Sequence, residues 1–345
     1  MDHNTGSRKV QTQFQKIEAE IALMERLSHP HVVRLHEVID DEEEKIMFMV
    51  LDFIAHGGIM DIRERRDARD KFTYFNPDTD GPLSLDFAAA ALHDVVSALE
   101  YLHKNHVCHR DLKPQNILVT DGKICKLADF GVAHFFESEQ VRSMKHMPVG
   151  ESRRGNLTAT EGTCHFWAPE MMGAEDPSHH DGAFSGYKQD IWALGVCLWI
   201  FIFGSLPFDD CEEEQLASLI TDSDPVFPYP VAPSLETLIR GMLAKSPLER
   251  ITLKDIKTCQ WLDEALSPEL RPLESRWPEG TFTKLEAFSS SHRSLVMHGH
   301  STRGDFSQRP MQDADSQGDG NGRCGPFMCS APPGRDPTCC VCALM

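Results

Sequence analysis

The sequence predicts an α+β fold with two lobes, a small lobe that has few β-strands and a larger lobe that is mostly helical. Two observations support this prediction. One amphipathic helix and two β-like runs fill the first part of the chain, whereas the hydrophobic spacing from there to about residue 262 is mostly helical. After that point the periodic apolar positions stop. We therefore divide the chain into an N-terminal segment at 1–13, a domain at 14–262 and a disordered tail at 263–345.

The small lobe is predicted from three short segments. Residues 14–27 predict a helix, because apolar side chains recur there at helical spacing. Two β-like runs follow at 32–39 and 46–54, and an acidic turn at 40–44 separates them. This order predicts a β-hairpin.

The larger lobe begins after a loop at 61–82, which is charged and rich in turn residues. A helix is predicted over 84–103, with Ser84 as its N-cap and with apolar positions at i, i+3 and i+4. Short extended runs at 117–119 and 125–127 flank a turn and predict a pair of strands.

An apolar run from Ile191 to Phe208 contains 18 residues without a charge. That length is at the lower limit for a membrane span. Gly195, Gly204 and Pro207 interrupt the run, and acidic segments flank it. We therefore predict a buried core helix rather than a membrane helix.

The composition limits the kinds of binding partner and the cellular compartment that we expect for this protein. The net charge is -19, which argues against nucleic acid or a bare anionic membrane as the main partner. The first 20 residues carry no apolar stretch of the kind found in a signal peptide. Of the 11 cysteines, the six that are scattered through residues 108–259 are therefore interpreted as reduced thiols, and we expect a cytoplasmic protein.

The segment 109–116 reads HRDLKPQN and carries two groups suited to phosphoryl transfer. The carboxylate of Asp111 can orient a substrate hydroxyl and accept its proton. The ammonium group of Lys113 can reach a transferring phosphoryl group as a point charge. Such chemistry needs positioning and charge neutralisation more than covalent help from the protein.

Two further residues offer oxygen atoms to Mg²⁺, a hard cation that prefers such ligands. Asn116 supplies a neutral amide oxygen, and Asp129, in the DFG motif at 129–131, supplies an anionic one. Each motif alone is a weak signal. The ordered set, which continues with APE at 168–170, is far more specific.

On these motifs, residues 14–262 resemble the eukaryotic protein kinases. The resemblance implies a bilobal protein-kinase-like fold with a truncated small β-lobe. It also implies transfer of the γ-phosphoryl group of ATP, with Mg²⁺, to protein hydroxyls. Lys113 and Thr163 are typical of kinases that act on serine or threonine rather than on tyrosine.

The resemblance also implies an ATP site. Glu20 lies where the family places the helix glutamate that pairs with a small-lobe lysine. Leu51 resembles the gatekeeper, and the segment from Asp52 to Ile54 resembles the hinge that binds adenine. Leu118 corresponds to the floor of the adenine pocket.

Other residues resemble positions with structural roles in the family. Asp190 resembles the aspartate that braces the catalytic loop, and Arg250 resembles the buried partner of Glu170. An apolar spine, typical of the active state, is implied at Met24, Leu35, His109 and Phe130.

The activation segment at 129–170 spans 42 residues and contains a polar, turn-like stretch at 136–158. Thr160 lies where activating phosphorylation often occurs in the family, and Arg110 is placed to pair with a phosphate there. A solvated loop without a regulatory role is the alternative interpretation.

Three strings resemble the calcium/calmodulin-dependent protein kinase kinases, namely EIALMERLSHPHVVRLHEVIDDEEE, DFGVAHFF and SGYKQDIWALGVCLWIFIFGSLPF. This resemblance implies protein substrates that include other kinases. No basic amphipathic helix is visible after residue 262, which argues against calmodulin binding.

The start of the family pattern is missing from this sequence. Only 19 residues precede Glu20, too few for the Gly-rich loop and the first three strands of the family. Lys9 lies 11 residues before Glu20, too close for the usual strand lysine. Either the sequence is an N-terminally incomplete active kinase, or the protein is a catalytically impaired pseudokinase that acts as a scaffold. Both alternatives leave a sheet edge open in the small lobe.

The last four residues, CALM, fit a prenylation box in which Cys342 carries the lipid and the methionine favours a farnesyl group. One lipid gives only marginal anchoring. No polybasic run supplies a second signal, which leaves palmitoylation of Cys339 or Cys340. We therefore expect a C-terminal lipid anchor at a membrane, with a chance cysteine or a zinc cluster as the alternatives.

Overall fold

The computed structural model divides the chain into two units, each with its own arrangement of elements. The larger unit contains residues 1–34 and 54–288, and the smaller unit contains residues 35–53 and 289–345. The structure describes residues 13–41, 46–63, 72–136, 156–157, 162–172, 184–210, 212–266, 329–330 and 339–344.

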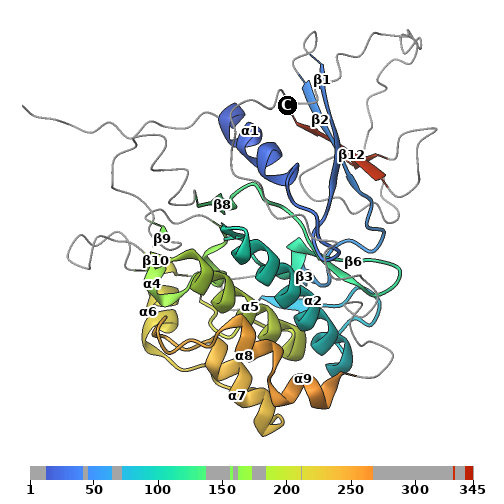
Figure 1. Ribbon diagram of the computed structural model, residues 1–345. Helices are drawn as coiled ribbons and strands as arrows, with labels where there is room; N and C mark the ends of the chain where they lie inside the picture. Colours follow the sequence, from blue (N-terminus) through green and yellow to red (C-terminus); the bar gives the residue numbers. More distant parts are fainter. Residues whose placement is uncertain are drawn as a thin grey trace, which may run out of the picture. The chain divides into compact units, whose positions relative to one another are not determined.

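The smaller unit is an antiparallel sheet in the strand order β1-β2-β12-β11 (Figure 1). β1 (Leu35–Asp41) and β2 (Ile46–Asp52) form the predicted hairpin, with Leu35 opposite Leu51 and Asp41 opposite Ile46. Within the hydrophobic run of β2, the side chains of Met49 and Val50 are buried. The predicted hairpin is thus confirmed, although Asp40 and Asp41 of the predicted turn belong to β1 and the rest of that turn lies outside the described residues.

The other two strands of this sheet come from the tail, for which the sequence predicts disorder. β12 (Cys339–Leu344) pairs with β2, and β11 (Cys329–Ser330) pairs with β12. In addition, α9 (Gln260–Ala265) continues past the predicted domain end at residue 262. The tail is therefore not wholly without structure, and part of it covers the strand edge that was expected to be open.

Two helices of the larger unit confirm predictions from hydrophobic spacing. α1 (Gln13–Met24) overlaps the predicted 14–27 but begins one residue and ends three residues earlier, and α2 (Leu85–Lys104) is displaced by one residue from the predicted 84–103. α2 follows Ser84, which has the extended backbone expected of an N-cap residue. Its apolar stripe is fully buried at Leu92, Val96, Leu99 and Leu102.

The first strand begins at Leu35 and not at Val32, as the sequence predicts. The difference has a physical cause in the larger unit. The N–H of Val33 donates to the backbone O of Leu127 at 2.8 Å, and Val32 forms a bridge to the same residue. These two valines are therefore used to join the start of the chain to the catalytic region.

α5 (Gly186–Phe203) contains most of the uncharged run and is buried along nearly its whole length, as predicted for a core helix. Gly195 permits close packing, because a Cβ there would lie 2.9 Å from the Cβ of Met242 in α7 (Pro233–Met242). Gly204 ends the helix with a left-handed φ of 68°. Among the described helices, none is long and apolar enough to cross a membrane.

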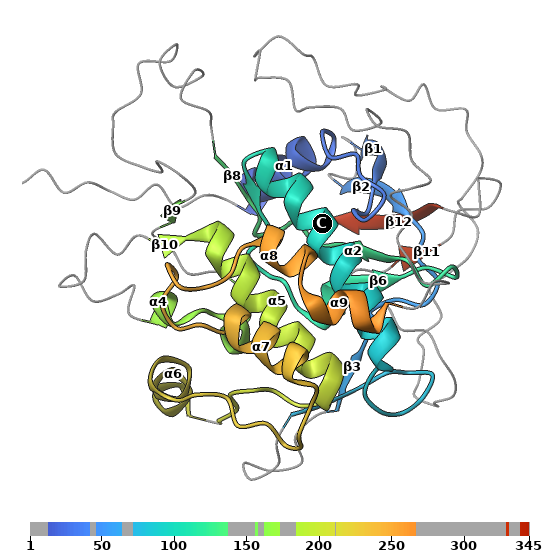
Figure 2. The ribbon, with the colours of Figure 1, turned by 60° about the horizontal axis from the view of Figure 1, so that its bottom comes forward.

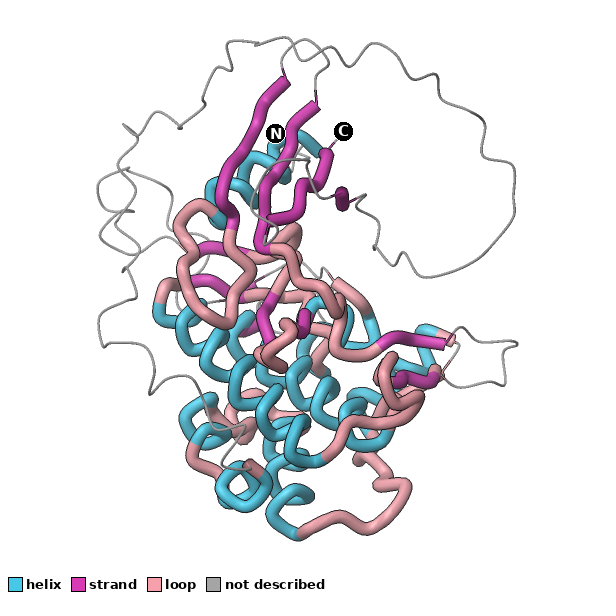
Figure 3. The backbone as a smooth tube through the Cα atoms, turned by 90° about the vertical axis from the view of Figure 1, so that its right-hand side faces the viewer, coloured by secondary structure: helices cyan, strands magenta, loops and turns pink. Residues whose placement is uncertain are grey.

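Short strand pairs and further helices complete the described part of the larger unit. The pairs are β3 (Asp61–Arg63) with β4 (Thr73–Phe75), β5 (Val107–Cys108) with β8 (His134–Phe135), β6 (Ile117–Val119) with β7 (Cys125–Leu127), and β9 (Asn156–Leu157) with β10 (Phe184–Ser185). The other α-helices are α4 (Pro169–Met172), α6 (Glu213–Asp222) and α8 (Leu253–Lys257). α2 packs against α5, α8 and α9, and α7 packs against α5 and α9 (Figure 2). Figure 3 shows the helices of this unit in cyan.

The strand predictions for this unit are partly correct. β6 and β7 coincide with the two extended runs predicted around a turn. The predicted loop at 61–82 instead contains β3 and β4, and the turn-like stretch at 136–158 contains β9. These strands have only two or three residues, too few to show an alternating pattern.

Candidate active site

The catalytic loop follows β5 and ends in the 3-10 turn Pro114–Asn116. Cys108 and His109 are fully buried, and Arg110 has a left-handed φ of 71°. A residue with a side chain is held in that conformation only where its surroundings fix it. Here the fixing group is a buried carboxylate of α5.

Asp190 of α5 is that carboxylate, and it has no exposed surface. Its Oδ2 accepts from the N–H of His109 at 3.0 Å, and its Oδ1 accepts from the N–H of Arg110 at 2.9 Å. Nε2 of His103, in the last turn of α2, lies 2.8 Å from Oδ2. Asp190 thus stands where the resemblance implies. His103 is not predicted, since the sequence marks it only as the end of a helix.

Asp111 lies in a network of donors that the catalytic loop and the activation segment supply. Nζ of Lys113 donates to Oδ2 at 2.6 Å. Thr163 donates to Oδ1 through its N–H at 3.1 Å and through its hydroxyl at 3.2 Å. Burial acts to raise the pKa of Asp111, but the hydrogen bond and the charge of Lys113 outweigh it and hold the pKa below its ordinary value. The carboxylate is therefore ionised at neutral pH.

Gly162 brings the activation segment against the catalytic loop. It has a φ of 100°, and a Cβ at this position would lie 2.7 Å from the backbone O of Arg110. Only glycine tolerates both conditions without strain. The close approach places Thr163 beside Asp111, whereas Thr160, the predicted phosphorylation site, lies outside the described residues.

The DFG motif is tied to the same loop. The N–H of Ala128 donates to the backbone O of Asn116 at 2.9 Å, and Nε2 of His109 lies 3.0 Å from the backbone O of Ala128. The rings of His109 and Phe130, two members of the predicted spine, have centroids 5.2 Å apart. These contacts with the catalytic loop therefore hold the DFG motif in place.

Asn116 and Asp129 fit a magnesium site by the atoms that they leave available. Nδ2 of Asn116 donates to the backbone O of Asp111 at 2.8 Å and to its Oδ2 at 3.2 Å, so Oδ1 is the atom left for a cation. Asp129 is exposed, and its Oδ1 accepts weakly from the N–H of Gly131 at 3.3 Å. One neutral and one anionic oxygen match the preference of Mg²⁺.

Glu20 of α1 lines a pocket of about 320 Å³ together with Arg110 and Gly131. Burial raises the pKa of Glu20 to about 7, and the negative charge of Asp129 adds to the rise. Within the described ranges this carboxyl group has no ion pair. Lys9, the weak candidate for a lysine partner, lies outside those ranges.

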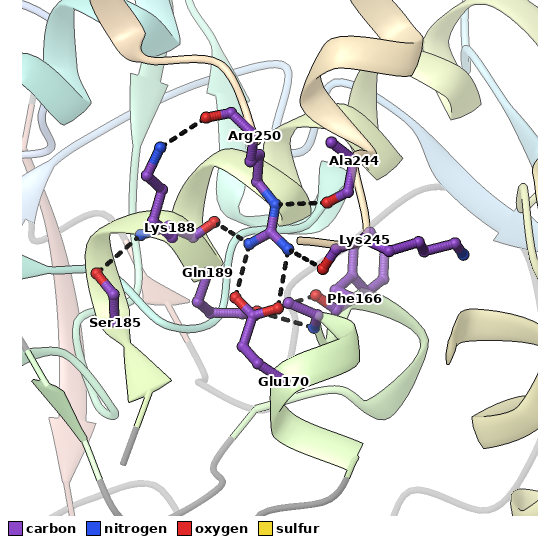
Figure 4. Close-up of polar contacts among 9 residues, drawn as sticks. Phe166, Glu170, Ser185, Lys188, Gln189, Ala244, Lys245 and Arg250 are labelled. Atoms are coloured by element: carbon purple, nitrogen blue, oxygen red, sulfur yellow. Dashed lines mark hydrogen bonds and ion pairs between the residues drawn. The ribbon is translucent and has the colours of Figure 1, made fainter. Parts of the chain in front are cut away.

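The ion pair between Glu170 and Arg250 joins the end of the activation segment to the helical core (Figure 4). Two nitrogens of Arg250 donate to the two carboxylate oxygens of Glu170 at 2.7 and 2.8 Å. Arg250 is 1% exposed and also donates to the backbone O of Lys188 at 2.8 Å and of Ala244 at 3.1 Å. The geometry agrees with the partnership that the resemblance implies.

Gln189 is a further residue of this region that the sequence does not single out (Figure 4). Its Oε1 accepts from the N–H of Ala168 at 2.9 Å, and its Nε2 donates to the backbone O of Phe166 at 3.0 Å. Both groups of the buried amide are thereby satisfied. Gln189 fixes the chain just before Glu170, one residue away from the Asp190 that fixes the catalytic loop.

The predicted adenine-site residues fall in both units. Leu51 and Asp52 end β2 in the smaller unit, where Oδ1 of Asp52 lies 2.8 Å from Nε2 of His36. Ile54 and Leu118 belong to the larger unit, and Leu118 lies in β6. The adenine pocket stays a prediction.

Comparison with known proteins gives the family. A family model described as "Protein kinase domain" matches residues 3–262. The chain is 34% identical over 261 residues to a calcium/calmodulin-dependent protein kinase kinase of Caenorhabditis elegans, which covers 75% of this chain and 42% of that protein. It is 32% identical over 250 residues to a probable serine/threonine-protein kinase of Dictyostelium discoideum, and this alignment covers 72% of this chain and 30% of that protein.

The chain therefore spans less than half the length of either relative. The matched residues include both the catalytic loop with Asp111 and the pair of Glu170 and Arg250. The predicted α+β fold and the resemblance read from the motifs are confirmed, and the chain belongs to the protein kinase family.

Proposed function

We propose that this chain transfers the γ-phosphoryl group of ATP to serine and threonine hydroxyls of proteins. One observation carries the proposal. The ionised carboxylate of Asp111 lies 2.6 Å from the ammonium group of Lys113 and 3.2 Å from the hydroxyl of Thr163. A proton acceptor and a cation thus stand together at the place where a hydroxyl would attack a phosphoryl group.

Each of the four predicted catalytic residues has a role in this reaction. Asp111 orients the substrate hydroxyl and accepts its proton as the hydroxyl oxygen bonds to the γ-phosphorus, while the bond from that phosphorus to the bridging oxygen breaks and ADP leaves. Lys113 stabilises negative charge on the transferring group. Asn116 and Asp129 would hold Mg²⁺, which when bound neutralises charge on the phosphates of ATP. A low pKa of Asp111 suits this role, because the loose transition state needs the proton acceptor mainly for orientation.

The variant Asp111→Asn tests the proposal, because it keeps the side-chain shape and removes the proton acceptor. We expect the rate of phosphate transfer from labelled ATP to serine and threonine peptides to fall by about 100-fold or more. Asp121→Asn is the matched control, since this carboxylate is 86% exposed in the turn between β6 and β7. Equal rates for the parent chain and Asp111→Asn would refute catalysis by this site.

A catalytically impaired scaffold is the second candidate function, and Glu20 is the observation that favours it. Its carboxyl group has no ion pair among the described residues, and its pKa is raised to about 7. Thermal unfolding with ATP, with and without Mg²⁺, separates the two candidates. A rise in melting temperature that needs Mg²⁺ supports the kinase, whereas no rise together with no transfer supports the scaffold.

We further propose that the substrates are proteins that include other kinases. The support is the 34% identity to a calcium/calmodulin-dependent protein kinase kinase, a name that denotes a kinase whose substrate is another kinase. Incubation with catalytically dead kinase domains and labelled ATP tests this proposal. Labelling of peptides but of none of these domains would contradict it.

Finally, we propose that the protein is cytoplasmic and held at a membrane by a lipid on Cys342, with palmitoylation of Cys339 or Cys340 as a second signal. The support is the sequence CALM at 342–345. Cys342→Ser should move the protein from the membrane to the soluble fraction, and Cys259→Ser should not. An unchanged distribution of Cys342→Ser would contradict the proposal.

A further inference from the structure

β12 is the least expected element of the fold, because it places the proposed lipid site inside a sheet. Residues 339–344 pair antiparallel with β2, with Cys339 opposite Asp52 and Leu344 opposite Met47 (Figure 1). The paired residues include all three cysteines of the proposed lipid anchor. The pairing and the lipid chemistry therefore concern the same six residues.

Position 342 has a strand on each side. In the register of the sheet, Cys342 lies opposite Met49 of β2 and opposite Cys329 of β11. Its backbone is thus in the interior of the sheet and not at an edge. An enzyme that encloses this residue must first separate it from both neighbours.

Both strands have sequences suited to this pairing. β12 reads CCVCAL and carries no charge, and β2 reads IMFMVLD with a single charge at its end. One edge of β2 is taken by β1, so the other edge would expose a row of unpaired N–H and C=O groups without β12. Covering that edge is a recognised way to prevent pairing with other chains.

We propose that residues 339–344 are a releasable strand that closes the β2 edge within one molecule, and that this pairing and lipidation of Cys342 exclude one another. Only the mutual exclusion rests on the proposed lipidation; the closure of the β2 edge does not. In the paired state the lipid site is withheld and the β2 edge is closed. In the released state the site is available to a transferase and the edge is open to another strand.

The chemical step requires release. Transfer from farnesyl diphosphate forms a bond between Sγ of Cys342 and C1 of the farnesyl group and breaks the bond from C1 to the diphosphate oxygen. The products are the thioether, diphosphate and the thiol proton, so no oxidant or reductant is needed. A transferase has to surround the segment that begins at Cys342, and its backbone is then unavailable to β2.

Two proline variants of the full chain test the strand pairing. Neighbouring residues of a strand direct their N–H groups to opposite sides, so Cys340→Pro and Val341→Pro cannot both spare the bonds to β2. Both positions precede the box at 342–345. Ser316→Pro, outside every described element, is the matched control.

Amide hydrogen exchange of β2 is the first measurement. We expect exchange within residues 47–51 to be about tenfold faster in at least one of the two variants than in the parent chain, and unchanged in Ser316→Pro. Tenfold corresponds to about 1.4 kcal/mol of opening free energy. Equal exchange in all four proteins would overturn the strand closure. Protection that increases with protein concentration would overturn closure within one molecule, because it indicates pairing between copies.

Farnesyl transfer in vitro is the second measurement, with synthetic peptides of residues 337–345 carrying the same substitutions as references. Dividing each protein's rate by the rate of its own peptide removes any direct effect of proline on the transferase. We expect this ratio to be about tenfold higher for the more strongly affected variant than for the parent chain. Equal ratios would overturn the exclusion.

The two measurements keep the separate ideas apart. If none of the peptides accepts a farnesyl group, the lipidation proposal fails and the exclusion fails with it. The exchange data then still decide whether β12 closes the β2 edge. If amide exchange of β2 is the same in all variants but farnesyl transfer is normal, the lipid-anchor proposal stands and the releasable-strand proposal fails.

Discussion

Two regions of the larger unit each carry a partly or fully buried carboxyl group, and the two groups differ in their partners. Asp111 in the catalytic loop accepts hydrogen bonds from Lys113 and Thr163, and its pKa lies below its ordinary value. Glu20 on α1 has no ion pair among the described residues, and its pKa is raised to about 7. Burial acts in the same direction on both groups, so the supply of donors decides the outcome.

The difference shows which half of the active site these residues complete. The hydroxyl side, around Asp111, has its acceptor, its cation and its braces within one connected network. The phosphate side, around Glu20, has a carboxyl group suited to pair with a cation. The described residues do not supply that cation. Four substitutions can break or sharpen this comparison, and they follow from the largest expected effect to the smallest.

The largest effect is expected for Asp190→Ala. The substitution removes the acceptor of the N–H groups of His109 and Arg110 and leaves both donors buried. We expect the free energy of unfolding to fall by about 3–5 kcal/mol, measured by urea denaturation. Asp121→Ala should change it by less than about 0.5 kcal/mol. A loss below about 1 kcal/mol for Asp190→Ala would mean that the catalytic loop does not depend on its brace.

Glu20→Gln is expected to increase the stability of the fold at high pH, whereas Asp190→Ala decreases it. The ordinary pKa of Glu20 is 4.5 and its pKa in the fold is about 7, so its contribution to stability is full below pH 4.5 and is lost as the pH rises through 7. The amide of the variant does not titrate. The stability of the variant relative to the parent should therefore rise by about 3 kcal/mol between pH 4.5 and pH 8.

Asp111→Asn is the comparison for that titration. The pKa of Asp111 is lowered in the fold, so its contribution is present above its ordinary value and is lost as the pH falls through the folded value. Urea denaturation of both variants from pH 3 to pH 8 measures the two profiles. Profiles of the same sign would show that the two carboxyl groups do not differ as the structure indicates.

The smallest effect is expected for His103→Ala. Nε2 of His103 lies 2.8 Å from Oδ2 of Asp190, which keeps its two backbone donors in the variant. We expect a loss of about 1–2 kcal/mol in stability and faster amide exchange at Arg110. His103→Gln, which can still donate, should recover part of both. A loss without any change in exchange at Arg110 would assign His103 a packing role only.

Much of the site is predictable because its residues lie close together in the sequence. HRDLKPQN and DFG carry their chemistry in a few consecutive residues, hydrophobic spacing is sufficient for α1 and α2, and an uncharged apolar run predicts most of α5. His103 and Gln189 act through contacts with residues 87 and 21 positions away, which no local pattern indicates. Gly162 is needed because its φ is 100° and because the backbone O of Arg110 lies against it, and both conditions arise only in the fold.

The tail shows the same limit in the strands. β12 has six residues without alternation of polar and apolar types, and its partner β2 lies far from it in the sequence. Its composition therefore does not distinguish a strand from an unstructured terminus. The pairing depends on an edge that only the folded hairpin provides.

The pair of Glu170 and Arg250 has a consequence for the folding pathway. The two residues are 80 positions apart, so their contact closes a long loop, and the entropy of that closure has to be offset before the ion pair forms. We predict that this ion pair forms after the rate-limiting step of folding, when the helical core that holds Arg250 has already packed. Substitutions at Arg250 should therefore leave the refolding rate nearly unchanged and speed unfolding, so that the pair determines how long the folded kinase domain persists.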